Sequence, residues 1–176
     1  MVNGNEIVEA RKEHMQQMVL LINEAYWEQQ QPFFIDTLAS RERINLAELD
    51  KIMSDPNQRT YVLINKKNHR VAGTIIIELP AEEEQAKVGL LAIGKEYRGK
   101  KLGHTLVEYV ENYARTLGRK LIKLEVFIFA KKLINYYESL GYSFTGNTAP
   151  FFHGNCIREK YRNSSDHYLS EMAKKL

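Results

Sequence analysis

The sequence is poor in several features that would each indicate a particular class of protein. It contains one cysteine, Cys156, so an internal disulfide is excluded and a reducing compartment, the cytoplasm, is expected. No apolar run approaches the roughly 20 residues of a membrane helix. The N-terminal MVNGNEIVEARKEH lacks the apolar segment of a signal peptide. The net charge of +3 is too small, and the basic residues too scattered, to indicate a nucleic-acid partner.

Two kinds of cofactor motif are also missing. The five histidines show no metal-ligand spacing, so we expect no metal site. The glycine-containing stretch at residues 94–104 is neither Gly-x-x-x-x-Gly-Lys-Ser/Thr nor Gly-x-Gly-x-x-Gly. Nucleotide-binding loops of the two best-known kinds are therefore excluded.

What is present suits one globular domain over residues 1–176, of which 44% are hydrophobic. Apolar periodicity predicts helices at residues 13–29, 41–53 (capped by Ser40), 101–117 and 130–140. It predicts strands at residues 7–10, 60–64, 71–79, 88–93 and 121–129, followed by a C-terminal β region. Residues 168–176 alternate imperfectly, so a strand or a helix is open there. The order β-α-α-β-β-β-α-β-α-β-β predicts an α/β domain with a mixed, mostly antiparallel sheet flanked by helices.

The stretch VGLLAIGKEYRGKKLGH, residues 88–104, carries the strongest functional signal. A buried strand breaks into a glycine- and lysine-rich turn, and a helical pattern follows directly. Free N–H groups at a helix start, together with the helix dipole, favour an anion. Arg98, Lys100 and Lys101 add positive charge there. The turn is predicted to bind phosphate, and a strand-to-helix turn with solvated lysines is the alternative.

This turn resembles the pyrophosphate loop of the GNAT N-acetyltransferase superfamily, Arg/Gln-x-x-Gly-x-Gly/Ala. Arg98 and Gly103 match, but Lys101 stands at the middle glycine, where a positive φ would cost about 1 kcal/mol or more. A second motif, NYYESLGY at residues 135–142, resembles the family's Leu-Tyr-Glu-Lys-Leu-Gly-Phe signature. Ala130 stands where members often carry an asparagine, and Lys131 or Lys132 is a candidate replacement for its donor contact.

The resemblance implies acetyl-CoA as cosubstrate. The main chain of the fourth strand would hold the pantetheine, at Leu91, Ala92 and Ile93. The turn would hold the pyrophosphate, through Arg98, Gly99, Lys100, Lys101, Leu102, Gly103 and His104. Tyr137 falls on the family's usual general-acid position; a core tyrosine on an amphipathic helix is the alternative.

The general base is less defined by the sequence. Glu78 lies near the end of the third predicted strand, on the face opposite Ile75 and Ile77, so it is our candidate base facing a cleft. A solvent-facing role is the alternative. Glu125 is a further candidate, or else an exposed partner of Lys123, and a water chain is a third route.

The resemblance implies an enzyme, an N-acetyltransferase that moves an acetyl group to a primary amine of a small molecule or peptide by direct attack on the thioester. The alternative function is a non-catalytic acyl-CoA sensor of the same fold. We expect no nucleic-acid or membrane partner, while a homodimer through the C-terminal strands is compatible with the class. The sequence does not identify the acceptor amine, whose site would involve residues 30–41 and 150–167. Tyr26, Trp27, Phe33 and Phe34 cluster where family members place the acceptor-side wall; core packing or a dimer surface is the alternative.

Overall fold

The computed structural model describes residues 4–30, 42–150 and 167–176. Within these ranges the strands are Asn5–Glu9 (β1), Gln58–Asn65 (β2), Arg70–Glu78 (β3), Gln85–Ile93 (β4), Leu121–Phe127 (β5), Ser143–Pro150 (β6) and His167–Lys175 (β7). The helices are Met15–Gln30 (α1), Leu46–Ser54 (α2), Leu102–Thr116 (α3) and Lys131–Ser139 (α4), with short 3-10 turns at Lys12–His14 (η1) and Lys95–Tyr97 (η2).

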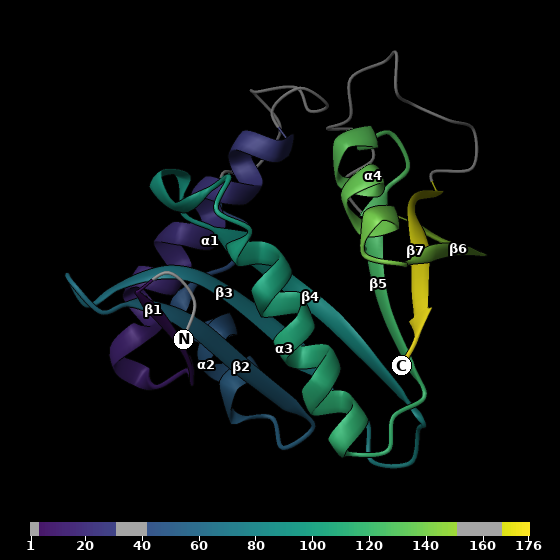
Figure 1. The fold of residues 1–176 in the computed structure, drawn as a ribbon, viewed down its shortest axis with the longest axis horizontal. Helices are drawn as coiled ribbons and strands as arrows, with labels where there is room; N and C mark the ends of the chain where they lie inside the picture. The colour runs from purple at the N-terminus through teal and green to yellow at the C-terminus, as the bar shows by residue number, and fades with distance from the viewer. Residues whose placement is uncertain (1–3, 31–41, 151–166) are drawn as a thin grey trace.

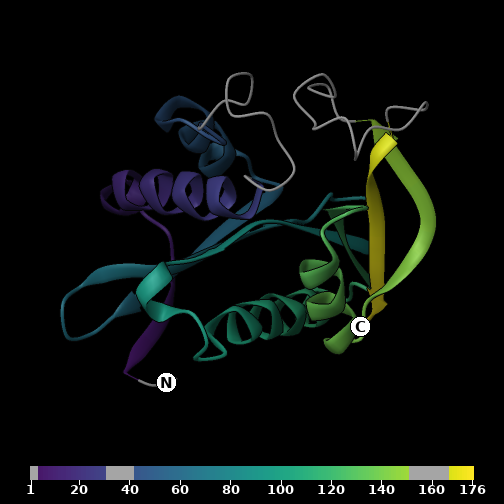
Figure 2. The ribbon, with the colours of Figure 1, turned by 90° about the horizontal axis from the view of Figure 1, so that it is seen from above.

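The strands form one seven-stranded sheet in the order β1-β2-β3-β4-β5-β7-β6. Every neighbouring pair is antiparallel except β4 and β5, which are parallel. Helices α1 and α2 cover one face of the sheet, and α3 and α4 lie on the other (Figures 1 and 2). The predicted α/β class and element order are confirmed.

Two apolar clusters hold these layers together. The α1/α2 side contains Met18 and Ile22 from α1, which are fully buried, and Leu90 and Ala92 from β4. The α3/α4 side contains Ile75 and Ile77 from β3 with the buried stripe of α3: Leu102, Leu106, Val107, Val110 and Ala114. The helices predicted at residues 13–29 and 101–117 therefore bury apolar stripes against the sheet, whereas Leu117, at the end of the second range, is 48% exposed just after α3 ends.

The second helix begins later than predicted. Its N-cap is Asn45, whose side chain accepts a hydrogen bond from the Glu48 N–H, while the Glu48 side chain accepts one from the Asn45 N–H. This reciprocal capping box satisfies two otherwise free donors and fixes the helix start at Leu46. The prediction of a helix start at Arg41 is therefore wrong; Ser40, its predicted cap, lies outside the described residues.

The C-terminal segment resolves as a strand. β7 pairs with β5 from Leu121↔Lys175 to Phe127↔Leu169, so the choice between strand and helix at residues 168–176 is decided by pairing rather than by alternation. Residues 30–41 and 150–167, expected to contact the acceptor, fall largely outside the described residues, as do Phe33, Phe34 and Cys156. None of the helices described is long and apolar enough to span a membrane.

The feature that positions the site is the divergence of β4 from β5. The two strands pair only over residues 85–87 and 121–123, and their C-terminal halves then separate into a V (Figure 1). In the same region β4 carries a bulge: Leu90, at φ 47°, and Leu91 together lie opposite the single residue Ile75 of β3. The bulge reverses the alternation of β4, so Val88 faces α3 whereas Leu90 faces α1.

Candidate functional site

A cavity of about 740 Å³ lies beside the end of β4, and we call it the loop cavity. Its walls come from the C-terminal part of α1, the β4 end, the turn after η2, the first residues of α3, and α4. The lining residues include Tyr26, Glu28, Leu91, Ala92, Ile93, Arg98, Gly99, Lys101, Leu102, Gly103, His104, Lys132 and Tyr136. All the predicted donor-binding residues except Lys100 therefore line one cavity.

The turn before α3 presents its backbone to this cavity. Gly99, at φ 74°, and Lys101, at φ 59° and ψ 16°, adopt left-handed conformations, so the turn tightens before α3 begins at Leu102. Lys101 is the N-cap, and no side chain caps the helix start. The first N–H groups of α3 are thus free to bind an anion. The positive φ considered for Lys101 from the sequence is therefore observed, with its cost of about 1 kcal/mol or more.

Two of the three cationic side chains of this turn already have hydrogen-bond partners within the protein. Arg98 donates from Nε to the Ile93 carbonyl (3.1 Å) and from a terminal nitrogen to Glu28 (2.5 Å). Lys100 donates to the Glu96 carbonyl and lies over the Tyr97 ring. Among the described residues Lys101 makes no ion pair, and the cavity has a further lysine, Lys132 of α4. Of the three predicted cations, only Lys101 has a side chain without an ion-pair or hydrogen-bond partner in the described residues. Lys132 is a second lysine of this kind at the cavity.

Gly103 allows α4 to approach the start of α3 closely. A Cβ added to Gly103 would lie 3.1 Å from the Tyr136 hydroxyl oxygen, which is tighter than normal packing. That hydroxyl is buried and has no hydrogen-bond partner in the described part of the chain. Burial raises the pKa of Tyr136 to about 12, so the phenol is neutral at pH 7 and keeps its proton to donate.

Tyr137 is buried and packs between the rings of Tyr136 and Tyr142, at centroid distances of 5.2 and 5.6 Å. Burial raises its pKa well above the ordinary value, and the phenol of Tyr26 raises it further. Tyr137 does not itself line the loop cavity, but Tyr26, beside it, does. Tyr137 therefore packs in the core and carries a neutral hydroxyl next to Tyr26 of the cavity wall.

Glu78 lies in a different hollow. It lines a groove of about 480 Å³ between α2 and the sheet, the α2 groove, together with Arg43, Lys51, Lys87, Gly89 and the bulge residue Leu90. Its place on the face opposite Ile75 and Ile77 is as predicted. Neighbouring residues of the bulge line the two hollows, Leu90 the α2 groove and Leu91 the loop cavity.

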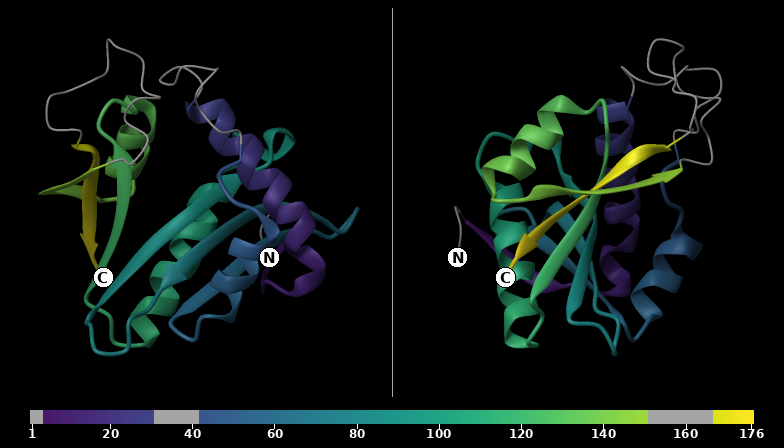
Figure 3. Two further views of the ribbon diagram at one scale, coloured as in Figure 1. Left: turned by 180° about the vertical axis from the view of Figure 1, so that it is seen from behind. Right: turned by 90° about the vertical axis from the view of Figure 1, so that its right-hand side faces the viewer.

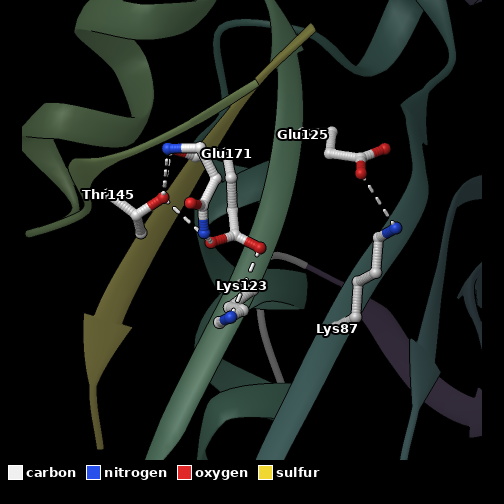
Figure 4. Close-up of polar contacts among 6 residues, drawn as sticks. Lys87, Lys123, Glu125, Thr145 and Glu171 are labelled. Atoms are coloured by element: carbon white, nitrogen blue, oxygen red, sulfur yellow. Dashed lines mark hydrogen bonds and ion pairs between the residues drawn. The ribbon is translucent and has the colours of Figure 1, made fainter. Parts of the chain in front are cut away.

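Beyond the α2 groove the same sheet face carries a band of paired charges, where no described helix covers β5, β7 and β6 (Figure 3). Lys87 of β4 donates to Glu125 of β5 at 3.1 Å, bridging the apex of the V. Lys123 pairs with Glu171 of β7 at 3.3 Å (Figure 4). The suggested pairing of Glu125 with Lys123 is therefore wrong; each has a partner on a neighbouring strand.

Glu171 is the most densely bonded member of this charged band. It accepts hydrogen bonds from Thr145 (2.9 Å) and Asn147 (3.0 Å) of β6 as well as from Lys123. Burial works against its charge, but the hydrogen bonds from Asn147, Thr145 and Lys123 outweigh burial and lower its pKa. Glu171 thus stays ionised and fixes β6 on β7 beside the V.

Sequence reasoning missed Glu28, Tyr136 and Glu171. Glu28 and Tyr136 lie within predicted helices, and Tyr136 also within the second motif, but no pattern there indicates that they face the cavity. Glu171 pairs with residues 24 to 48 positions away. No cluster of three or more metal-ligating side chains occurs within residues 4–30, 42–150 and 167–176.

Comparison with known proteins agrees with this arrangement. The sequence matches the acetyltransferase (GNAT) family over residues 21–142. Spermidine N-acetyltransferase from Vibrio cholerae, solved with CoA and spermine, is similar at 18% identity and a TM-score of 0.72, over 98% of this chain and 95% of that one. PaiA N-acetyltransferase from Thermoplasma acidophilum, solved with coenzyme A, is similar at 17% identity and 0.72, over 98% and 99%. An acetyltransferase from Streptococcus agalactiae 2603 has 21% identity and 0.68, over 99% of each chain. No protein of curated function matches the sequence.

Proposed function

This chain belongs to the acetyltransferase (GNAT) family and is an acyltransferase, and we propose that it transfers the acetyl group of acetyl-CoA to a primary amine of a small molecule or peptide. The observation that carries the proposal is the uncapped start of α3, which opens with Lys101 onto the loop cavity. That two similar structures hold CoA supports the choice of donor. We place the whole activity in a single domain, residues 1–176, in the cytoplasm.

The donor is proposed to lie along the loop cavity. The pyrophosphate takes the free N–H groups of Leu102, Gly103 and His104 and the ammonium groups of Lys101 and Lys132. The main chain of residues 91–93, released from β5 by the V, holds the pantetheine amides. We propose that the thioester then lies near the β4 bulge, whose residues Leu90 and Leu91 line the α2 groove and the loop cavity.

The acceptor is proposed to enter from the α2 groove and the charged band. Its amine must be neutral to attack, whereas a free amine with a pKa near 10 is mostly protonated at pH 7. Glu78 is the proposed base, since among the described residues it makes no ion pair, whereas Glu125 is held by Lys87. A proton passing from the amine to Glu78 would travel through water along the groove.

The chemical step then balances as a direct acyl transfer. The neutral amine, whose ammonium proton has already passed through Glu78 to solvent, bonds through nitrogen to the acetyl carbon. The nitrogen then loses a second proton to the regenerated Glu78 carboxylate as the carbon–sulfur bond breaks. The departing CoA thiolate takes a proton from Tyr137, whose raised pKa keeps that proton available, and solvent restores it. A backbone N–H at the bulge stabilises the charge that develops on the carbonyl oxygen.

The test is release of CoA thiol from acetyl-CoA in the presence of a panel of primary amines, with the acetylated amine identified by mass spectrometry. We expect amine-dependent thiol release. Tight CoA binding with no turnover on any amine would support a non-catalytic acyl-CoA module instead. Absence of CoA binding would reject the donor assignment.

A further inference from the structure

The carboxylate of Glu28 lies inside the cavity proposed to hold the donor's phosphates. Glu28 is in the last turn of α1 and lines the loop cavity with Arg98 and Lys101. An acidic side chain is unexpected there, because the negative end of the α1 dipole also points this way and both disfavour an anion. No part of the proposed reaction uses this carboxylate.

Glu28 is held by the cations of the turn. Its two oxygens accept from Arg98 at 2.5 Å and from Lys95 at 3.5 Å. Arg98 is fixed independently, since its Nε donates to the Ile93 carbonyl at the end of β4. The hydrogen bond from Arg98 lowers the pKa of Glu28, so the carboxylate is charged at neutral pH.

We propose that Glu28 is an internal anion that weakens donor binding by competing with the pyrophosphate for Arg98. This inference rests on the proposed function, because it needs CoA in the loop cavity. Loss of Glu28 would leave Arg98 in place through Ile93 and would expose its full charge to the phosphates. Glu28 is thus a residue that sets donor affinity rather than one that builds the site.

The reason such a residue helps turnover lies in what acetyl-CoA and CoA share. Both carry the same pyrophosphate, so every contact to it stabilises substrate and product equally and does not lower the barrier of the chemical step. Tight phosphate binding would instead slow the release of CoA. By taking part of the charge of Arg98, Glu28 shortens the residence time of the product.

The experiment compares the full chain with Glu28→Gln, measuring CoA affinity by calorimetry and CoA release by stopped flow. We expect Glu28→Gln to tighten CoA about fivefold at low salt, as for one unit charge near 4 Å in water, and to slow release. The gain should shrink at about 0.5 M salt. Acetyl-pantetheine, which has no phosphate, should bind both proteins equally.

Glu96→Gln is the matched control. Glu96 lies in η2 on the same turn and loses the same charge, but its carboxylate pairs with no cation of the described residues and does not line the cavity. It should change CoA affinity far less than Glu28→Gln. In an Arg98→Gln background the part of the gain that comes from freeing Arg98 is absent, so the effects of the two substitutions on CoA affinity should be non-additive, as expected for residues in contact.

Unchanged or weaker CoA binding by a folded Glu28→Gln protein would overturn the inference while leaving the proposed function intact. Equal tightening by Glu96→Gln would overturn it too, since net charge alone would then explain the gain. If the unsubstituted protein bound no CoA, the proposed function and this inference would fail together.

Discussion

The two sides of the V are built in opposite ways. The proposed donor side, the loop cavity, comes mainly from one continuous stretch, the β4 end, the turn and the start of α3, within residues 91–104. The proposed acceptor side, the α2 groove with the charged band, comes from α2, β3, β4, β5, β6 and β7, and the charges of the band are paired across strands. Backbone groups dominate the first and side chains the second. We infer that a shared donor needs a fixed backbone cradle, whereas an acceptor is selected by exchangeable side chains.

The sharpest test of this contrast is the pair of neighbouring tyrosines on α4. We expect Tyr137→Phe to lower kcat by about 10²–10⁴, typical of a lost general acid, with CoA affinity nearly unchanged. Tyr136→Phe removes an unpartnered hydroxyl of the loop cavity, so it should change CoA affinity severalfold and kcat little. Steady-state kinetics and calorimetry on both variants measure the difference. An unaltered kcat in folded Tyr137→Phe would return Tyr137 to a packing role.

The carboxylates of the acceptor side give the next largest expected effect. Glu78→Gln should lower kcat by about 10²-fold if Glu78 is the base. Glu125→Gln leaves Lys87 unpaired and should mainly raise the KM for the amine, by a few fold. Glu108→Gln, on the exposed side of α3 across the sheet, is the control and should change neither. A larger kcat loss in Glu125→Gln than in Glu78→Gln would transfer the role of base to Glu125.

Variants at Lys101 distinguish the effect of its charge from the effect of its backbone conformation on CoA binding. Replacing Lys100 and Lys101 together by Glu should weaken CoA about tenfold or more at low salt, because two cations become anions near the phosphates. Lys101→Gly also removes the ammonium but relieves a left-handed residue, so we expect CoA binding to weaken a few fold while stability rises by about 1 kcal/mol. Thermal unfolding and calorimetry report the two effects. Unchanged CoA affinity in the double Glu variant would reject the loop as the phosphate site.

The smallest expected effect concerns the buried tyrosines behind the donor side. The pKa values of Tyr137 and Tyr142 are raised, mainly by burial, above those of unfolded tyrosine, near 10. Below pH 10 both states keep these protons, so stability does not change. Above pH 10 only the unfolded chain loses them, and stability falls by about 1.4 kcal/mol per pH unit for each such tyrosine.

Urea unfolding between pH 9 and pH 11 measures this slope. Tyr142→Phe should reduce the slope by the share of one tyrosine, whatever it does to stability at pH 8. An identical slope in the variant would mean that Tyr142 ionises as easily in the folded protein as in the unfolded one.

The donor side was largely predictable because its signals are local. The positive φ considered at Lys101, the free N–H groups at a helix start and the match of Gly103 to the motif are all read from consecutive residues. The start of α2 was equally local but was misread, since Asn45 with Glu48 forms the better capping box. The ion pair that Arg98 makes with Glu28 was not predictable, because Glu28 lies 70 residues away on α1.

The sequence by itself determined the order of strands and helices, the apolar faces that pack them and the turn that begins α3. These depend on periodicity and on the conformations open to neighbouring residues. Only the tertiary structure decided that Glu28 forms an ion pair with Arg98, that Lys87 bridges the V to Glu125, and that the β4 bulge lines both the α2 groove and the loop cavity. Such contacts join segments far apart in the chain, and their geometry exists only after the sheet has set the register of its strands.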